Sequence, residues 1–294
     1  MRLDDGRDLA WFEVGAPRGV PVFVFHGSPG RSFEFSIYDQ VARRVKVRLI
    51  SLDRPGYGHS TYKPRRKLGD FGSDIRQFAD HLGVDTFSVL GHSGGGPHAL
   101  ACARFLPERV RRCAVVSGVA PPGRANMTEG MMLTNRMQWV LYSRWPAKLD
   151  GLAATLGWLV APVLAAFLKY GLRHPETRLD GFAKMLPACD AEVVARPEIR
   201  AQLVAEAREF SLPTARTAIQ DMALCIRPWD FSLADIDVVV DIWHGDRDRN
   251  VPLAQGQELA RTIPNASLHE CVGEGHWLVV DHMEEILIAL ASST

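Results

Sequence analysis

Residues 90–97 read LGHSGGGP and contain the strongest local signal in the sequence. It contains G-x-S-x-G between an apolar run at 87–90, which predicts a strand, and residues 97–105, which predict a helix. A strand that turns sharply into a helix holds a serine at the apex, in strained backbone, with its hydroxyl exposed above the sheet. The flanking glycines have no Cβ, so the chain can pass close to itself there. The stretch predicts Ser93 as a nucleophile, although the same pattern also occurs in ordinary glycine-rich loops.

Strand-like and helix-like segments alternate on both sides of this stretch, which predicts βαβ units. The strand-like runs are almost continuously apolar, as is typical of strands covered on both faces. The sequence therefore predicts an α/β fold with a mostly parallel, doubly wound sheet. We expect strands at 9–14, 20–25, 45–52, 87–90, 112–117, 236–243 and 266–271, and helices at 70–82, 97–105, 254–262 and 283–291.

The alternation stops after about residue 119, and residues 121–227 have a helical pattern rich in Ala, Leu, Met and Trp. We expect a core formed by residues 1–119 and 231–294, and a helical lid formed by residues 120–230. An insertion at this point lies outside the carboxyl ends of the strands, where sheets of this kind bind ligands.

Composition limits the classes of function. The chain has 294 residues, 47% of them hydrophobic, which is enough for a large core. Lys+Arg and Asp+Glu are both 34, so the formal net charge is zero. This balance indicates neither a nucleic-acid partner nor an anionic surface. The basic run KPRRK at 63–67 is interpreted as a solvated loop.

Cysteine usage and the N-terminus favour the cytoplasm. The five cysteines are scattered and form no CxxC pair, which argues against a disulfide framework or a zinc site. The first residues carry acids where a signal peptide has a basic region.

Residues 152–168 are almost entirely apolar and reach the lower limit of membrane-spanning length. Gly157 and Pro162 interrupt them, and polar segments flank them. We interpret the segment as helices of a globular domain, and contact with a membrane through it stays an alternative.

A nucleophilic serine needs a base, and the base needs an acid that orients it. His276, in the GEGHW loop after the last expected strand, is the candidate base. His92 adjoins the serine and should point away from it, while His26 and His244 each end a strand and are interpreted as structural. The acid should lie between serine and base in the chain. By position, two candidates in the loop HGDRDRNVP at 244–252 qualify: Asp246 and Asp248.

An oxyanion hole needs two backbone donors. One is expected to be the N–H of Gly94, which follows the nucleophile. The other should come from the loop HGSPG at 26–30, after the strand at 20–25, and we assign it to the N–H of Ser28.

Together these motifs resemble the α/β-hydrolase fold family, specifically its serine hydrolases with a helical lid. The resemblance covers about residues 9–119 and 236–290. HGSPG resembles the family's oxyanion loop, residues 53–60 (DRPGYGHS) resemble its D-x-x-G-x-G-x-S turn, and residues 248–252 resemble its D-x-x-V-P acid loop. The resemblance implies Asp248, rather than Asp246, as the acid of a Ser93–His276–Asp248 triad.

Departures from the family's branches narrow the activity. Ser93 stands where haloalkane dehalogenases and epoxide hydrolases have an aspartate. HGSPG differs from the HGGG of one lipase and esterase branch and is nearer to the HGGPG of proline iminopeptidases, whose elbow usually carries a bulky residue where this chain has Gly94.

We therefore expect a carboxylesterase-like enzyme that hydrolyses a small to medium, hydrophobic ester through an acyl-enzyme, with no metal or other cofactor. Amide or peptide, lactone, thioester and carbon–carbon bond hydrolysis are alternatives, as is a non-catalytic ligand receptor. The partner is a small-molecule substrate, and the sequence predicts no particular oligomeric state. The substrate is expected to contact aromatic side chains, namely Trp139, Trp145, Trp158, Phe167 and Trp277.

Overall fold

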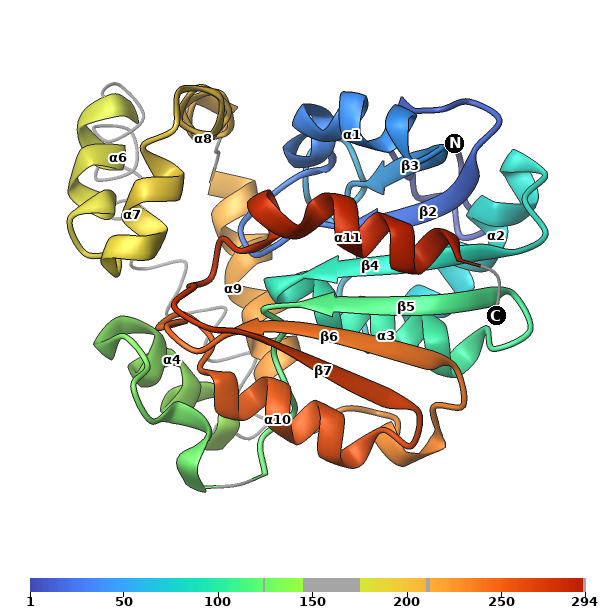
Figure 1. Ribbon diagram of the computed structural model, residues 1–294. Helices are drawn as coiled ribbons and strands as arrows, with labels where there is room; N and C mark the ends of the chain where they lie inside the picture. Colours follow the sequence, from blue (N-terminus) through green and yellow to red (C-terminus); the bar gives the residue numbers. More distant parts are fainter. Residues whose placement is uncertain (124, 145–174, 210–211, 293–294) are drawn as a thin grey trace.

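A computed structural model describes residues 1–123, 125–144, 175–209 and 212–292. Its centre is one sheet of seven strands in the order β1-β3-β2-β4-β5-β6-β7. β1 is antiparallel to β3, and the other neighbouring pairs are parallel, which confirms the predicted fold class (Figure 1). The strands are β1 (Trp11–Gly15), β2 (Val20–Phe25), β3 (Val47–Leu52), β4 (Phe87–His92), β5 (Val110–Val116), β6 (Val239–Gly245) and β7 (Ala266–Cys271).

Helices cover both faces of the sheet, which explains the continuous apolar runs of its strands. On one face, α1 and α11 pack over a cluster that includes Val22, Val24 and Leu90. On the other face, α2, α3 and α10 pack over a cluster that includes Phe23 and Ile242. These helices are α1 (Asp39–Arg44), α2 (Asp70–Leu82), α3 (Gly96–Phe105), α10 (Leu253–Thr262) and α11 (Val279–Ala291).

Several expected elements have other bounds in the structure; α11, for example, begins at Val279 rather than at residue 283. Residues 236–238 were expected to begin a strand, but β6 begins at Val239. The Ser232 side chain accepts a hydrogen bond from the Ala234 N–H at 3.2 Å and closes a 3-10 turn, η5 (Leu233–Asp235), just before them. A 3-10 helix, η1 (Ser32–Tyr38), and α1 follow the HGSPG loop, where the sequence pattern indicated no helix.

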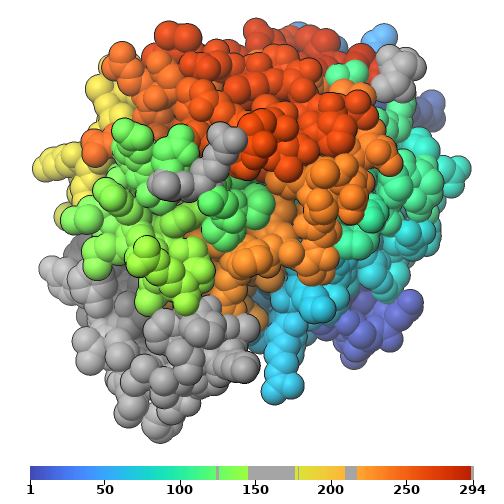
Figure 2. All heavy atoms as spheres, turned by 90° about the horizontal axis from the view of Figure 1, so that it is seen from below, coloured from blue at the N-terminus to red at the C-terminus, as the bar shows by residue number. Residues whose placement is uncertain are grey.

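Between β5 and β6 the described chain is helical, as expected, and we call its residues 125–144, 175–209 and 212–226 the helical block. It lies beyond the carboxyl ends of β4 and β5, and α9 runs along those ends (Figure 1). Figure 2 shows η3 and α4 beside α10, where the Met132 N–H donates to the Arg249 carbonyl oxygen at 2.8 Å. The elements of the block are η3 (Ala125–Thr128), α4 (Leu133–Arg144), α6 (Pro175–Ala183), α7 (Ala188–Val194), α8 (Pro197–Glu209) and α9 (Leu212–Ile226).

Among the helices of the described residues, none combines the length and apolarity needed to cross a membrane. The apolar run at 152–168, with the lipid contact considered for it, lies outside the described residues.

Candidate active site

Ser93 occupies the turn between β4 and α3. Its φ is +53°, in the left-handed region that non-glycine residues rarely adopt, so the backbone is strained at this position. A Cβ at Gly91 would collide with the carbonyl oxygen of Gly95, and a Cβ at Gly95 would collide with that of Phe25. The turn therefore requires these two glycines, and it presents Ser93 to a cavity that His276 also lines.

His276 and Asp248 are brought together from two loops at the carboxyl ends of β7 and β6. The Nδ1 of His276 lies 2.8 Å from Oδ2 of Asp248. The other oxygen of Asp248, Oδ1, accepts hydrogen bonds from the backbone N–H groups of Asn250 and Val251, both at 2.8 Å. The carboxylate is thus held by its own loop while it orients the imidazole.

Asp246, the other acid allowed by position, contacts the loop before His276 rather than His276 itself. Its side chain is exposed, and its Oδ1 accepts a hydrogen bond from the backbone N–H of Gly273 at 2.7 Å. The structure therefore pairs Asp248 rather than Asp246 with the histidine.

The ionisation of this pair suits a histidine that accepts a proton. Burial acts to lower the pKa of His276, but the charge and hydrogen bond of Asp248 outweigh it and raise the pKa above the ordinary 6.5. Burial acts to raise the pKa of Asp248, but His276 beside it holds the pKa below 3.8. Asp248 stays ionised at neutral pH, and the imidazolium is stabilised when it forms.

The two expected oxyanion donors lie next to each other. A Cβ built on Gly94 would lie 2.5 Å from Oγ and 3.4 Å from the backbone N of Ser28. A Cβ built on Gly27 would lie 3.4 Å from the Cβ of Ser93, so the HGSPG loop passes directly beside Ser93. Only a glycine at position 94 allows this approach, which is a physical reason for the absence of a bulky residue there.

The other histidines of the motifs are buried, and Nε2 of His92 lies 3.4 Å from the carbonyl oxygen of His276. His26 and His244 are fully buried, and His244 Nε2 bonds the carbonyl oxygen of Val251 at 2.7 Å. His92 lies with Nδ1 at 3.2 Å from Oε1 of Glu34 and with its ring 5.3 Å from that of His276, centroid to centroid. Its side chain thus turns to the cavity wall.

The cavity above Ser93 has a volume of about 1140 Å³. It is lined by the HGSPG loop, by the loops that contain Ser93 and His276, and by the helical block. Of the aromatic residues expected to contact substrate, Trp139 and Trp277 line it. Trp145, Trp158 and Phe167 lie outside the described residues. Much of the remaining lining is apolar, including Met131, Leu179, Met222 and Ile226.

One part of the cavity wall is acidic, which the sequence reasoning missed. Glu34 of η1 and Glu206 of α8 both line the cavity. Burial and the neighbouring Glu34 raise the pKa of Glu206 to about 8. These two residues are 172 positions apart in the sequence, so no local motif indicates them.

A buried charged cluster, also missed, lies beside the HGSPG loop. Asp221 of α9 pairs with the guanidinium groups of Arg54 and Arg66, and all three side chains are almost completely buried. Arg66 belongs to the basic run at 63–67 that was interpreted as a solvated loop, and for this residue the interpretation is wrong. The carboxylate of α9 draws Arg66 inward because a buried charge needs a partner.

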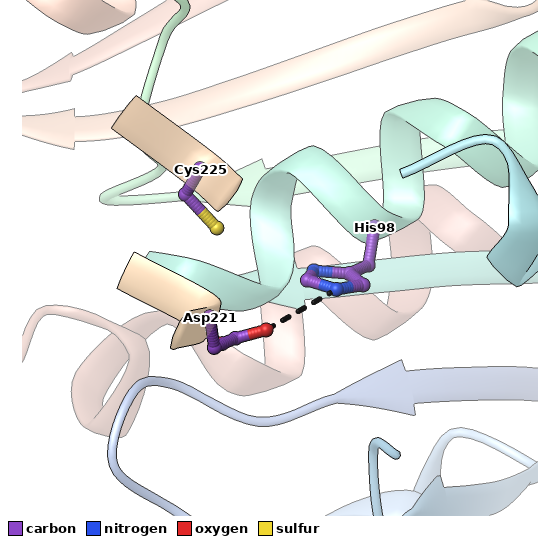
Figure 3. Close-up of side chains that lie close together, drawn as sticks. All are labelled: His98, Asp221 and Cys225. Carbon is purple, nitrogen blue, oxygen red and sulfur yellow. Dashed lines mark ion pairs between the residues drawn. The ribbon is translucent and has the colours of Figure 1, made fainter. Parts of the chain in front are cut away.

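Asp221, His98 and Cys225 lie close enough to be considered as ligands of a cation (Figure 3). The distance from His98 Nε2 to Asp221 Oδ1 is 3.6 Å. Both oxygens of Asp221 are, however, paired with arginine side chains. Two neighbouring guanidinium charges oppose a metal ion at this point, so the cluster fits an ion-pair network better.

A second group, Cys271, Glu274 and His282, is partly buried. Here Nε2 of His282 bonds Glu274 at 2.9 Å and Nδ1 bonds Glu285 at 3.2 Å. Both ring nitrogens therefore already have carboxylate partners.

A further acid of the helical block reaches the histidine loop. Asp190 of α7 is 1% exposed, and its Oδ1 accepts a hydrogen bond from the backbone N–H of Trp277 at 3.0 Å. A Cβ at Gly275 would collide with its carboxylate. The glycine before His276 is thus required by the close approach of α7.

Comparison with known proteins agrees with this architecture. The sequence profile described as the alpha/beta hydrolase family matches residues 22–289. A 2-hydroxymuconate semialdehyde hydrolase of Pseudomonas putida is 28% identical over 275 residues, which cover 90% of this chain and 84% of that protein. The acetyltransferase component of an acetoin cleaving system from the same species is 33% identical over 129 residues, but the chain spans only 34% of its length.

Among solved structures, a hydrolase from Pseudomonas aeruginosa PA01 has a TM-score of 0.68 at 18% identity. The match covers 100% of this chain and 97% of that one. At this identity the likeness concerns the fold.

Proposed function

Because the chain belongs to the alpha/beta hydrolase family, we propose that it is a serine hydrolase that cleaves a carboxylic ester through an acyl-enzyme on Ser93. The observation that carries the proposal is the 2.8 Å contact between His276 and Asp248, at a cavity that a strained Ser93 also lines. Acyl transfer requires a nucleophile, a base and an acid that orients the base, and the order Ser93, Asp248, His276 along the chain is the one typical of α/β-hydrolases.

In the proposed reaction, His276 takes the proton of Ser93 while Oγ attacks the ester carbonyl carbon. The resulting oxyanion is bound by the N–H groups of Ser28 and Gly94. His276 then gives its proton to the leaving alkoxide as the C–O bond breaks, and an acyl-enzyme remains. Water, losing a proton to His276, attacks this ester; the second collapse releases the acid and returns the proton to Ser93.

We propose a hydrophobic acyl or alcohol group for the substrate, and residues 120–230 as a lid over it. The apolar lining with Trp139 and Trp277 supports this, because binding sites for apolar groups are walled by such side chains. Glu34 and Glu206 occupy one part of the wall, and Glu206, with its pKa raised to about 8, would be mostly protonated at neutral pH and able to donate a hydrogen bond there.

Carbon–carbon bond hydrolysis is the second candidate. It is favoured by one observation, the similarity to a 2-hydroxymuconate semialdehyde hydrolase over 90% of this chain. The Ser93–His276–Asp248 arrangement would serve both reactions, so the substrate distinguishes them.

Fluorophosphonate labelling and p-nitrophenyl ester hydrolysis test the proposal. We expect labelling of the wild type, loss of labelling in Ser93→Ala, and a fall in kcat of at least about a thousandfold in that variant. Near wild-type turnover by Ser93→Ala would contradict the assignment of the nucleophile.

A substrate panel tests the specificity. Medium-chain p-nitrophenyl esters should have a higher kcat/KM than charged, polar esters, and the reverse order would contradict the hydrophobic site. Faster turnover of a 2-hydroxymuconate semialdehyde than of any ester would favour the second candidate.

A further inference from the structure

The Gly27–Ser28 peptide group contains the proposed second oxyanion donor, which is the Ser28 N–H. Its carbonyl oxygen, that of Gly27, has hydrogen-bond partners of its own. The carbonyl oxygen of Gly27 accepts a hydrogen bond from Nη2 of Arg54 at 2.8 Å, and Nδ1 of His26 also lies 2.8 Å from it. In a planar trans peptide the N–H points opposite to the C=O. Fixing the carbonyl on Arg54 therefore turns the Ser28 N–H away from the Arg54 guanidinium, and this N lies close to Gly94, at 3.4 Å from the position of a Cβ there.

The Ser28 side chain is held by the same cluster. Its hydroxyl donates to Oδ2 of Asp221 at 2.5 Å and accepts a hydrogen bond from Nη2 of Arg54 at 2.7 Å. A hydroxyl has only one proton to donate. Because that proton goes to Asp221, the backbone N–H is the donor that Ser28 can offer to an oxyanion.

Arg54 itself is fixed by burial and charge. Its side chain is 0% exposed, its Nη1 pairs with Asp221, and its guanidinium stacks over the Tyr57 ring at 5.0 Å. Burial acts to raise the pKa of Asp221, but Arg54 and Arg66 hold it well below 3.8, so the carboxylate stays charged. Buried ion pairs contribute little net stability compared with apolar packing, so their presence is better explained by what they orient.

We propose that Asp221 and Arg54 are positioning residues for the oxyanion hole: they lock the Gly27–Ser28 peptide with its N–H toward the reacting carbonyl. Arg54 also polarises this peptide through its carbonyl oxygen, which strengthens the N–H as a donor. This inference rests on the proposed acyl transfer at Ser93. It also means that α9, part of the helical block, completes a catalytic element of the core.

Asp221→Asn tests the inference, with Asp74→Asn as the matched control. Asp74 also forms a buried ion pair, to Arg7 at 2.5 Å, with side chains 3% and 10% exposed, but its second ion-pair partner is Lys63 and not a residue that contacts the HGSPG loop. Each variant is assayed for kcat, for KM and for inhibition by a trifluoromethyl ketone. The ketone forms a tetrahedral adduct with the serine, and its oxyanion occupies the hole.

We expect Asp221→Asn to lower kcat about 10- to 100-fold, less than the loss of a whole donor, while KM changes less than about threefold. The inhibition constant of the ketone should rise by the same factor as kcat/KM falls. Asp74→Asn should keep both kcat and the ketone affinity, even if its melting temperature falls as far as that of Asp221→Asn. Hydrogen exchange of residues 26–30 should be faster in Asp221→Asn than in the control.

Arg54→Lys and Ser28→Ala provide the same test if Asp221→Asn does not fold. Arg54→Lys keeps the charge but loses the planar fork that bonds Gly27 and Asp221 together, and we expect a kcat loss in the same range. Ser28→Ala keeps the backbone N–H and should lower kcat less than Arg54→Lys does.

Two failures are distinguishable. A labelled, active wild type whose Asp221→Asn variant has the kcat and ketone affinity of Asp74→Asn would contradict the positioning role alone. A wild type that the fluorophosphonate does not label would contradict the proposed acyl transfer and, with it, this inference.

Discussion

Two aspartates of the helical block, Asp221 in α9 and Asp190 in α7, make an instructive comparison. Both are buried, and each contacts one loop of the candidate site, Asp221 the HGSPG loop and Asp190 the loop that contains His276. Asp221 is paired with two guanidinium groups, whereas the hydrogen bond to Asp190 comes from the uncharged N–H of Trp277.

Their pKa values move in opposite directions as a result. Burial raises the pKa of Asp190 above 3.8, and the backbone donors and His276 only partly offset it. The pKa of Asp221 is held well below 3.8 because its two arginines outweigh its burial. One acid is therefore a permanently charged part of a network, while the other is a hydrogen-bond acceptor whose charge the fold tolerates at a cost.

The largest difference should be in stability. Asp221→Ala leaves two buried guanidinium groups without their partner, and we expect the free energy of unfolding to fall by about 3–5 kcal/mol. Asp190→Ala removes an acceptor of backbone hydrogen bonds and should cost about 1–3 kcal/mol. Urea denaturation at pH 7 measures both, and equal losses would mean that the arginines do not depend on Asp221.

The pH dependence of stability should have opposite signs for the two residues. Asp221, with its lowered pKa, stabilises the fold above pH 3.8, and this contribution is lost as the pH falls toward its folded pKa. Asp190, with its raised pKa, does the reverse: the fold loses stability as the pH rises from 3.8 through its folded pKa.

In denaturation series from pH 3 to pH 8, the free energy of unfolding of Asp221→Asn should therefore fall furthest below that of the wild type near pH 8. The free energy of unfolding of Asp190→Asn, relative to that of the wild type, should be highest near pH 8. The same sign for both variants would contradict the comparison.

The smallest effect should be on the pH profile of activity. The charge of Asp190, after that of Asp248, helps to raise the pKa of His276. The acid limb of kcat/KM should inflect above pH 6.5 in the wild type, since the base must be deprotonated.

Asp190→Asn should shift this inflection to lower pH, by less than Asp248→Asn does. Asp221→Asn should leave it in place while it lowers the plateau. A shift in the Asp221 variant as large as that in the Asp190 variant would mean that the two acids act on the histidine alike.

The core and its loops could be predicted from the sequence because their signals are local. The G-x-S-x-G turn, the loop containing His276 and the strand at 20–25 are each contained in a few consecutive residues, and the structure has them at those positions. Asp246 and Asp248 shared one loop, and the motif D-x-x-V-P, rather than the turn itself, favoured the residue that contacts His276.

The helical block offered no such signals for its acids. Asp221 and Arg54 are 167 positions apart, and a pair at that separation has no sequence pattern. The one clue was an aspartate in the apolar helix 218–226, because an ionised residue on a buried helix face needs a partner. Arg66 gave no signal of its own because it lies in a run of basic residues, and such residues are mostly exposed to solvent.

The position of Asp190 and Asp221 also bears on recombination between relatives. A helical block taken from another hydrolase to transfer its substrate preference would arrive without these two carboxylates unless its helices carry acids at the same places. Arg54 and Arg66 would then be left buried without their counter-charge. A functional chimera should therefore exchange Arg54 and Arg66 together with residues 188–226, or keep both aspartates in the grafted helices.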